Sequence, residues 1–224
     1  MAEQTKNQAA PAVEESLNQS EAFFLKYKNA IIGCVVAVVV IVGGIVCYKT
    51  FISEPNEQKA STAIAKCQEL FQNQQFEQAL NGDSVNAGFL AIAEQYSSTD
   101  AGNLANLYAG LCYANTDKWE EAAQYLEKYD EAGDQMISPA ALGALGNAYA
   151  HLDQLDKAVS TLTKAAEKAD NNTLSPTFLI QAGQILEKQG KKEDALKLYQ
   201  QIKEKYFQSM QYQTIDEYIE RVSE

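Results

Sequence analysis

The fold of this chain is decided by residues 142–165, LGALGNAYAHLDQLDKAVSTLTKA. A glycine, an aromatic residue or leucine three positions on, and an alanine twelve positions on occur here and twice more, with glycines 36 and 37 residues apart. Stacked helical hairpins repeat every ~34 residues, and each buries its apolar face against its neighbours. The sequence therefore predicts an all-α array. Its repeat signature comprises Gly110, Tyr113, Ala122, Gly146, Tyr149, Ala158, Gly183, Leu186 and Ala195.

An uncharged apolar stretch precedes the array at residues 30–48, AIIGCVVAVVVIVGGIVCY. At ~1.5 Å per residue these 19 residues nearly span a hydrocarbon core of ~30 Å, so we expect a transmembrane helix. A cleaved signal peptide is disfavoured because its apolar region is only ~7–15 residues long. A lipid-modified Cys34 is disfavoured because most of the apolar stretch follows that cysteine. A buried core helix would need protein on every side.

Charge indicates the orientation of the helix and excludes one class of partner. Lys26 and Lys28 precede the stretch and Lys49 follows it, which only weakly biases the orientation. The short amino-terminal tail favours a cytoplasmic N-terminus, with the large domain on the other side. Residues 50–224 carry the whole net charge of −12 and contain no cluster of cations, so nucleic acid is not an expected partner.

The segments expected from these patterns are a disordered cytoplasmic tail (1–22), the transmembrane helix with its flanks (23–51), a linker (52–59) in which Pro55 stops a straight helix, and a repeat domain (60–224). The repeat domain divides into an irregular first hairpin (60–98), repeats at about 103–136, 139–172 and 176–209, and a closing helix (214–223).

Helix boundaries inside the repeats have recognisable signals. Thr99 or Asp100 is expected to cap one helix, and the pairs Ser138-Pro139 and Ser175-Pro176 predict an N-cap serine with proline at the first helical position. Gly190 is expected in the turn between the last two helices.

The repeats resemble the tetratricopeptide repeat, whose signature places a bulky residue, leucine-glycine and tyrosine on the first helix and alanine, a bulky residue and alanine on the second. The central unit matches at Leu142, Leu145, Gly146, Tyr149, Ala158, Leu162 and Ala165. The flanking units depart at Asn106, Ala109, Tyr129, Ala182, Leu186 and Ile202. The resemblance implies a right-handed α-solenoid that binds proteins, with no catalysis, cofactor or small-molecule substrate.

One amino-terminal span followed by such an array is similar to the ancillary SecYEG translocon subunit family. That resemblance implies a bacterial inner-membrane protein with a periplasmic repeat domain. It would be an accessory factor of protein export that binds the translocon, periplasmic chaperones or translocating clients. The alternative is a structural adaptor of an envelope assembly or division complex.

A candidate groove for partner proteins lies on the first helices of the hairpins. Two interpretations of its apolar part remain open: either it takes a partner segment, or the irregular helix at residues 87–96 packs there. The central unit offers no cation that could hold a carboxylate, although Asn147 could bond a peptide backbone. The candidate partner-binding residues are Leu104, Leu107, Tyr108, Leu111 and Asn147.

Candidate catalytic and metal-binding patterns are weak. The sole histidine, His151, has no serine or cysteine placed beside it as a nucleophile, and we expect a surface or helix-cap role for it. The four cysteines form no CxxC or CxxH pattern. Cys67 and Cys112 could pair in an exported domain or remain separate core thiols. The sequence therefore predicts a non-enzyme without catalytic, cofactor or metal residues.

Overall fold

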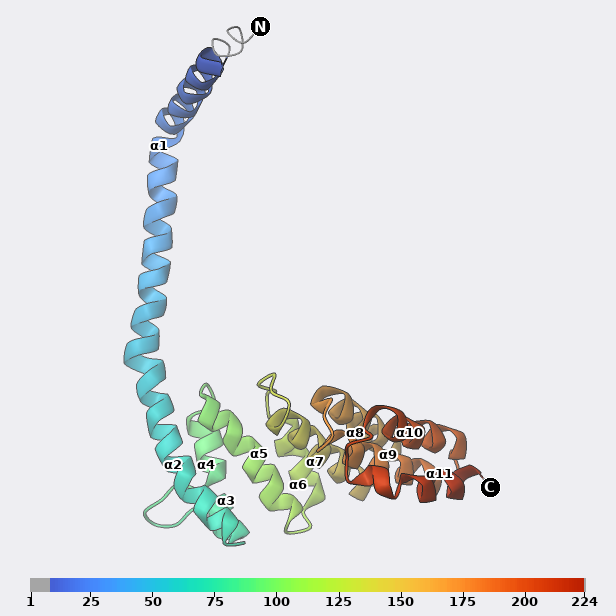
Figure 1. The fold of residues 1–224 in the computed structure, drawn as a ribbon. Helices are drawn as coiled ribbons and strands as arrows, with labels where there is room; N and C mark the ends of the chain where they lie inside the picture. The colour runs from blue at the N-terminus through green and yellow to red at the C-terminus, as the bar shows by residue number, and fades with distance from the viewer. Residues whose placement is uncertain (1–8, 224) are drawn as a thin grey trace, which may run out of the picture. The chain divides into compact units, whose positions relative to one another are not determined.

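The computed structural model describes the backbone of residues 9–223, together with the side chains of Phe23 and residues 25–223. All regular elements within this range are helices (Figure 1). The chain forms two compact units, Met1–Pro55 and Asn56–Glu224. The expected all-α class is confirmed.

The first unit is dominated by one long helix, α1 (Ala9–Tyr48). Side chains 32–48 are all exposed, and α1 is long and apolar enough to cross a membrane by length and composition. The tail expected to be disordered is helical from residue 9, while residues 1–8 lie outside the described residues. Pro11 falls in the first turn of α1, where a missing N–H costs nothing, so it does not oppose this helix.

The expected linker at residues 52–59 is also helical, which corrects that prediction. A π-helical turn, η1 (Lys49–Ser53), follows α1 and leads into α2 (Glu54–Gln72). The N–H of Glu54 donates to the carbonyl of Lys49 across this wide turn. Pro55 comes directly afterwards, in the first turn of α2, where proline is tolerated. A proline in this sequence therefore lies in the first turn of a helix and does not end it.

The second unit is an array of helical hairpins (Figure 1). After α2 come two short helices, α3 (Phe76–Asn81) and α4 (Phe89–Gln95), which form the irregular beginning of the array. The regular hairpins are α5 (Asp100–Ala114) with α6 (Trp119–Glu127), α7 (Ile137–His151) with α8 (Leu155–Ala169), and α9 (Ser175–Lys188) with α10 (Lys192–Lys205). A short 3₁₀ turn, η2 (Gln211–Gln213), precedes the last helix, α11 (Ile215–Ser223).

The repeated glycines lie where the two helices of a hairpin cross. A Cβ atom added to Gly146 would lie 2.7 Å from Leu162 Cγ, and one added to Gly183 would lie 2.4 Å from Tyr199 Cε1. In both hairpins the contacted residue is 16 positions later, on the second helix. Glycine is therefore needed because a larger residue would force the helices apart.

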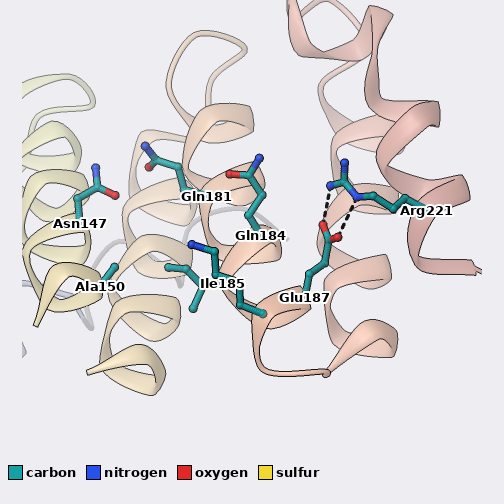
Figure 2. Close-up of a pocket in the computed structure, with 8 residues that line it drawn as sticks. Asn147, Ala150, Gln181, Gln184, Ile185, Glu187 and Arg221 are labelled. Carbon is teal, nitrogen blue, oxygen red and sulfur yellow. Dashed lines mark hydrogen bonds and ion pairs between the residues drawn. The ribbon is translucent and has the colours of Figure 1, made fainter. Parts of the chain in front are cut away.

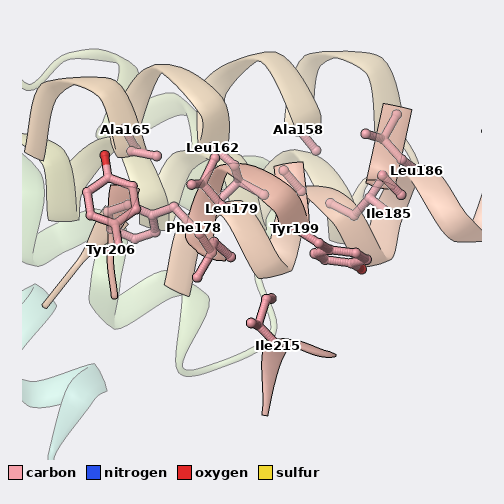
Figure 3. Close-up of a cluster of buried hydrophobic side chains, with 14 of the residues drawn as sticks. Ala158, Leu162, Ala165, Phe178, Leu179, Ile185, Leu186, Tyr199, Tyr206 and Ile215 are labelled. Carbon is pink, nitrogen blue, oxygen red and sulfur yellow. The ribbon is translucent and has the colours of Figure 1, made fainter. Parts of the chain in front are cut away.

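Buried side chains of α8, α9, α10 and α11 form one continuous cluster (Figure 3). Leu162, Leu179 and Tyr199 are fully buried in it. Ile215 and Val222 of α11 are 0% and 6% exposed, so α11 covers the end of this cluster. The last helix thus closes a core that α9 and α10 would otherwise leave open to water.

The turns within the hairpins share one backbone geometry. Asp117, Asp153 and Gly190 have φ values of 57°, 57° and 74° and occupy equivalent positions between α5 and α6, α7 and α8, and α9 and α10. The predicted turn at Gly190 is confirmed. Aspartate is among the few residues other than glycine that enter this left-handed region readily, which explains why two turns need no glycine.

Gly190→Ala is expected to lower the free energy of unfolding by about 1 kcal/mol, the cost of a left-handed alanine. No atom lies within 4 Å of the added Cβ, so the loss would come from the backbone and not from a clash. Urea titration followed by far-UV circular dichroism measures it. Gln200→Ala, at an exposed position of α10, is the control and should have no measurable effect.

The starts of α7 and α9 differ from the prediction. Thr99 caps α5 as expected, with its hydroxyl accepting from the N–H of Gly102 at 2.9 Å. Ser138 and Ser175, however, lie inside the first turns of α7 and α9. Asp134 accepts from the backbone N–H groups of Met136 and Ile137 at the start of α7, and Asn171, 37 residues later, accepts from those of Thr173 and Leu174 just before α9. In both places the residue that binds these N–H groups precedes the serine by four positions.

The hydroxyl groups of the two serines instead bind backbone groups of the segments that precede the helices. Both are buried, with 1% and 0% exposure. Ser138 Oγ accepts from the N–H of Ala132 at 3.0 Å, and Ser175 Oγ donates to the carbonyl of Ala166 at 2.7 Å. A Ser-Pro pair thus predicts the helix start correctly, but the serine hydroxyl binds the backbone of the preceding segment.

Asp134→Ala is expected to cost about 1 kcal/mol at neutral pH, the usual value of an N-cap. Hydrogen bonds from the Ser138 hydroxyl and from backbone N–H groups lower the pKa of Asp134 from 3.8 to about 2. Because the folded pKa lies below the unfolded one, this stability is present above about pH 4 and is lost as the pH falls towards 2. Asp134→Asn should keep the cap and lose the pH dependence. Urea midpoints at pH 2–7 test this, and an unchanged acid profile in Asp134→Asn would contradict it.

Candidate functional site

A groove of about 490 Å³ opens between α7, α9 and α11 (Figure 2). This volume lies within the ~300–1,000 Å³ of typical ligand sites. The first helices of two consecutive hairpins and the closing helix therefore share one open surface. Its lining residues are Asn147, Ala150, Gln181, Gln184, Ile185, Glu187, Lys188 and Arg221.

Three carboxamide side chains project into this groove from α7 and α9, namely Asn147, Gln181 and Gln184. Asn147 and Gln184 make no hydrogen bond to any residue that the structure describes. The Oε1 atom of Gln181 is buried and also lacks a donor. A buried acceptor without a partner costs roughly 1–3 kcal/mol, so this atom is available for an N–H group from a ligand.

A closed ionic cluster forms the wall of the groove at α11. Arg221 donates from Nε and Nη2 to the two carboxylate oxygens of Glu187, at 2.9 and 2.7 Å. The hydroxyl of Tyr199 donates to the same carboxylate at 2.5 Å. The Arg221 hydrogen bonds lower the pKa of Glu187, while burial and the Glu187 contact raise the pKa of Tyr199. Glu187 is therefore ionised and fully engaged, and it fixes α11 to α9.

Four of the predicted partner-binding residues lie elsewhere, packed within the array. Leu107 is 6% exposed, in a buried cluster with residues of α6 and α7. The ring of Tyr108 stacks on Phe89 of α4, with centroids 5.1 Å apart and planes 9° apart. Leu104 and Leu111 are partly buried against the same clusters. Of the five candidates, only Asn147 lines the groove.

A second, smaller cavity of about 220 Å³ lies beside α6, α7 and α8. Helix α6 ends at Glu127, and the loop that follows it does not fill this space. Leu126, Ala141 and Leu145 form its apolar floor, and Lys164 is paired with Glu131 at its edge. It is smaller than typical ligand sites.

The family model for the tetratricopeptide repeat-like domain matches residues 21–216, most of the chain. The chain belongs to the tetratricopeptide repeat-like domain family. Two solved structures of a Podosopora anserina putative kinesin light chain with nearly identical TPR-like repeats, one of them a point variant, are similar to it. Each has a TM-score of 0.57 and 13% identity over 74% of this chain, and 85% and 86% of theirs. This likeness supports the fold. No curated protein matches the chain.

Tetratricopeptide repeat-like folds are protein-interaction scaffolds, and the groove lies on the first helices of their hairpins in this chain. Gln181 and Gln184 were missed from the sequence, although the repeat period contains the signal for one of them. Gln184 follows Asn147 by 37 residues, the spacing of Gly146 and Gly183. The role of Arg221 has no such signal, because it depends on where α11 packs.

The groups considered for chemistry have structural surroundings. His151 stacks on Trp119, with ring centroids 3.6 Å apart. Cys67 and Cys112 are free, buried thiols, and burial raises the pKa of Cys112 to about 12. A thiol with such a pKa is not a nucleophile at neutral pH. Within the residues that the structure describes, no group of three or more His, Cys, Asp or Glu side chains could hold a metal ion.

Proposed function

We propose that this protein is a membrane-tethered, non-catalytic scaffold that binds an extended segment of another protein in the groove between α7, α9 and α11. The observation that carries the proposal is the set of unpaired carboxamides on Asn147, Gln181 and Gln184. A carboxamide both donates and accepts, as a peptide group does. The buried Gln181 Oε1 would gain the N–H that it lacks. Such contacts bind the main chain of the partner and are therefore compatible with many partner sequences.

The tether supports a role at a membrane. The side chains at 32–48 in α1 are exposed, and the stretch at 30–48 has no charge. A hydrocarbon environment would cover these side chains. We place α1 in a bacterial inner membrane with its N-terminus in the cytoplasm and the array in the periplasm. There the protein would act as an accessory factor of export that holds chaperones or translocating clients near the translocon.

Site-specific photocrosslinking from the groove tests this function. A photoreactive residue at the exposed Gln184 should crosslink to translocon subunits, periplasmic chaperones or exported polypeptides in native membranes, as identified by mass spectrometry. The matched control carries the same residue at Gln200, which is exposed on α10 and does not line the groove. Products specific to Gln184 are expected.

Two results would contradict the proposal in different ways. Crosslinks to envelope-assembly or division proteins would replace the export role with that of a structural adaptor. Equal products from both positions would show that the groove is not the binding surface. The location of the array has its own test, because protease added to spheroplasts should digest residues 56–224. Protection of the array would place it in the cytoplasm.

A further inference from the structure

The loops that precede α5, α7, α9 and α11 lie along one edge of the array, which we call the entry edge. Side-chain hydrogen bonds of 2.7–3.2 Å join neighbouring parts of this edge: Asn103 with Asp130, Asn171 with Gln135, and Gln211 with Thr177. The opposite edge consists of the turns within the hairpins. The two edges therefore present different loops to their surroundings.

The chain enters the array at the entry edge. The carboxylate of Glu57, in the first turn of α2, accepts from the N–H groups of Asp100 and Ala101 at the start of α5, at 2.7 and 3.1 Å. Asn56, the first residue of this unit, follows the uncharged stretch at 30–48 by eight residues. Eight residues span about 12 Å as a helix and at most about 29 Å when extended. A membrane that contains the stretch at 30–48 is therefore within reach of this edge.

The exposed apolar side chains of the array gather on the same edge. Among the described residues after 55, six large hydrophobic side chains are exposed, and five of them lie here: Met136, Ile137, Phe207, Met210 and Tyr212. The sixth, Val85, belongs to the loop between α3 and α4. None of the six lies in the turns within the regular hairpins, so the apolar surface occurs on the side where the chain arrives from the stretch at 30–48.

Carboxylates of the entry edge are paired with lysines. Three ion pairs or clusters form there: Glu131 with Lys164 and Lys168, Asp170 with Lys205, and Asp216 with Lys203. Pairing lowers the cost of bringing a carboxylate towards an apolar medium. The acidity of the domain therefore opposes a lipid contact less at this edge than its net charge suggests.

We propose that the entry edge lies against the lipid surface around the transmembrane helix, with Met136, Phe207 and Met210 inserted at the level of the headgroups and the adjoining acyl chains. Apolar side chains leave water in this position, and the ring and hydroxyl of Tyr212 suit the same boundary. Zwitterionic lipid is the occupant, because the net charge of −12 on residues 50–224 repels anionic headgroups. The inference rests on the membrane tether of the proposed function and adds a second membrane contact, which restricts rotation of the array about the tether.

Tryptophan fluorescence of the full chain in phosphatidylcholine nanodiscs tests the proposal. One copy per disc excludes a partner protein and a second copy. Trp119, the only tryptophan, is replaced by phenylalanine, and a tryptophan is then introduced at one position at a time. Met136→Trp and Met210→Trp report on two places of the entry edge, two hairpins apart. Gln154→Trp is the matched control, because Gln154 is exposed in the turn between α7 and α8, on the opposite edge.

Lipids brominated on their acyl chains should quench the fluorescence of Met136→Trp and Met210→Trp and leave that of Gln154→Trp unchanged. Acrylamide, which stays in water, should quench in the reverse order. Val40→Trp, within the stretch at 30–48, tests the tether itself and should be quenched by the brominated lipid. Far-UV circular dichroism checks that each variant keeps its helices.

The outcomes separate this inference from the function on which it rests. Quenching of Val40→Trp without quenching at either edge position would overturn the lipid contact and leave the tether in place. Quenching at one edge position only would overturn the edge-on arrangement, because the array would then touch lipid with one end. Protection from acrylamide without quenching by brominated lipid would show that protein covers the edge, which also overturns the proposal. No quenching of Val40→Trp would overturn the tether itself, and crosslinking from Gln184 tests the groove independently.

Discussion

Phe89→Ala is expected to lower the free energy of unfolding by about 3–5 kcal/mol, the largest loss that we predict for a single substitution. Phe89 is fully buried in α4, and its ring stacks on Tyr108 of α5. The ring of Phe71 from α2 meets the same tyrosine edge to face, with centroids 5.3 Å apart. Removing Phe89 would leave a cavity between α4 and α5 and take away the contact that orders Tyr108.

Urea titration of the full chain in detergent, followed by far-UV circular dichroism, measures this loss. Phe207→Ala is the matched control, because Phe207 is 60% exposed and its removal should change the free energy of unfolding by less than about 0.5 kcal/mol. If Phe89→Ala costs under about 1 kcal/mol, α4 does not hold Tyr108. Tyr108 would then be available to a partner, and the apolar groove predicted from the sequence would regain its support.

The sequence predicts the hairpins well because their packing is local and repeated. Gly146 and Leu162 meet within one hairpin, and their spacing is visible in the pattern. The helix starts are less predictable, since Ser138 is a strong N-cap residue and Asp134 a better placed one. The linker predicted around Pro55 differs from the structure for a similar reason. Proline is compatible with the first turn of a helix as well as with its end.

The groove is harder to predict than the fold because it joins residues from three elements. Asn147 was identified from the position of its helix face alone. Gln181 and Gln184 face it from the next hairpin, which depends on the offset between repeats. Arg221 reaches Glu187 across 34 residues, and this contact requires α11 to cover the last hairpin. From the sequence, the apolar face of α5 could bind either a partner or α4. Only the structure distinguishes the two, because Phe89 of α4 packs on Tyr108 of α5.

The link between fold and groove leads to the second large effect, that of Gly183→Val. At this position even a Cβ atom would lie 2.4 Å from the ring of Tyr199, which is fully buried between α9 and α10. Valine adds two further methyl groups, so the ring must move or the helices must separate. Overpacking of this kind typically costs up to about 3 kcal/mol, and we expect a loss at that upper end.

The substitution should also disturb the groove, because Tyr199 donates to Glu187 and Glu187 holds Arg221. Urea titration measures the stability. Photocrosslinking from Gln184 measures the groove, without urea and at a temperature where the variant is folded. Gln184→Val is the control for stability: it places valine one residue later on α9, at an exposed position, and should cost less than about 1 kcal/mol. Wild-type stability in Gly183→Val would show that α9 and α10 can move apart freely. In that case the close contact at glycine would not be what fixes the Tyr199–Glu187–Arg221 wall, and the position of α11 would have to be set by its other contacts, among them the buried Ile215 and Val222.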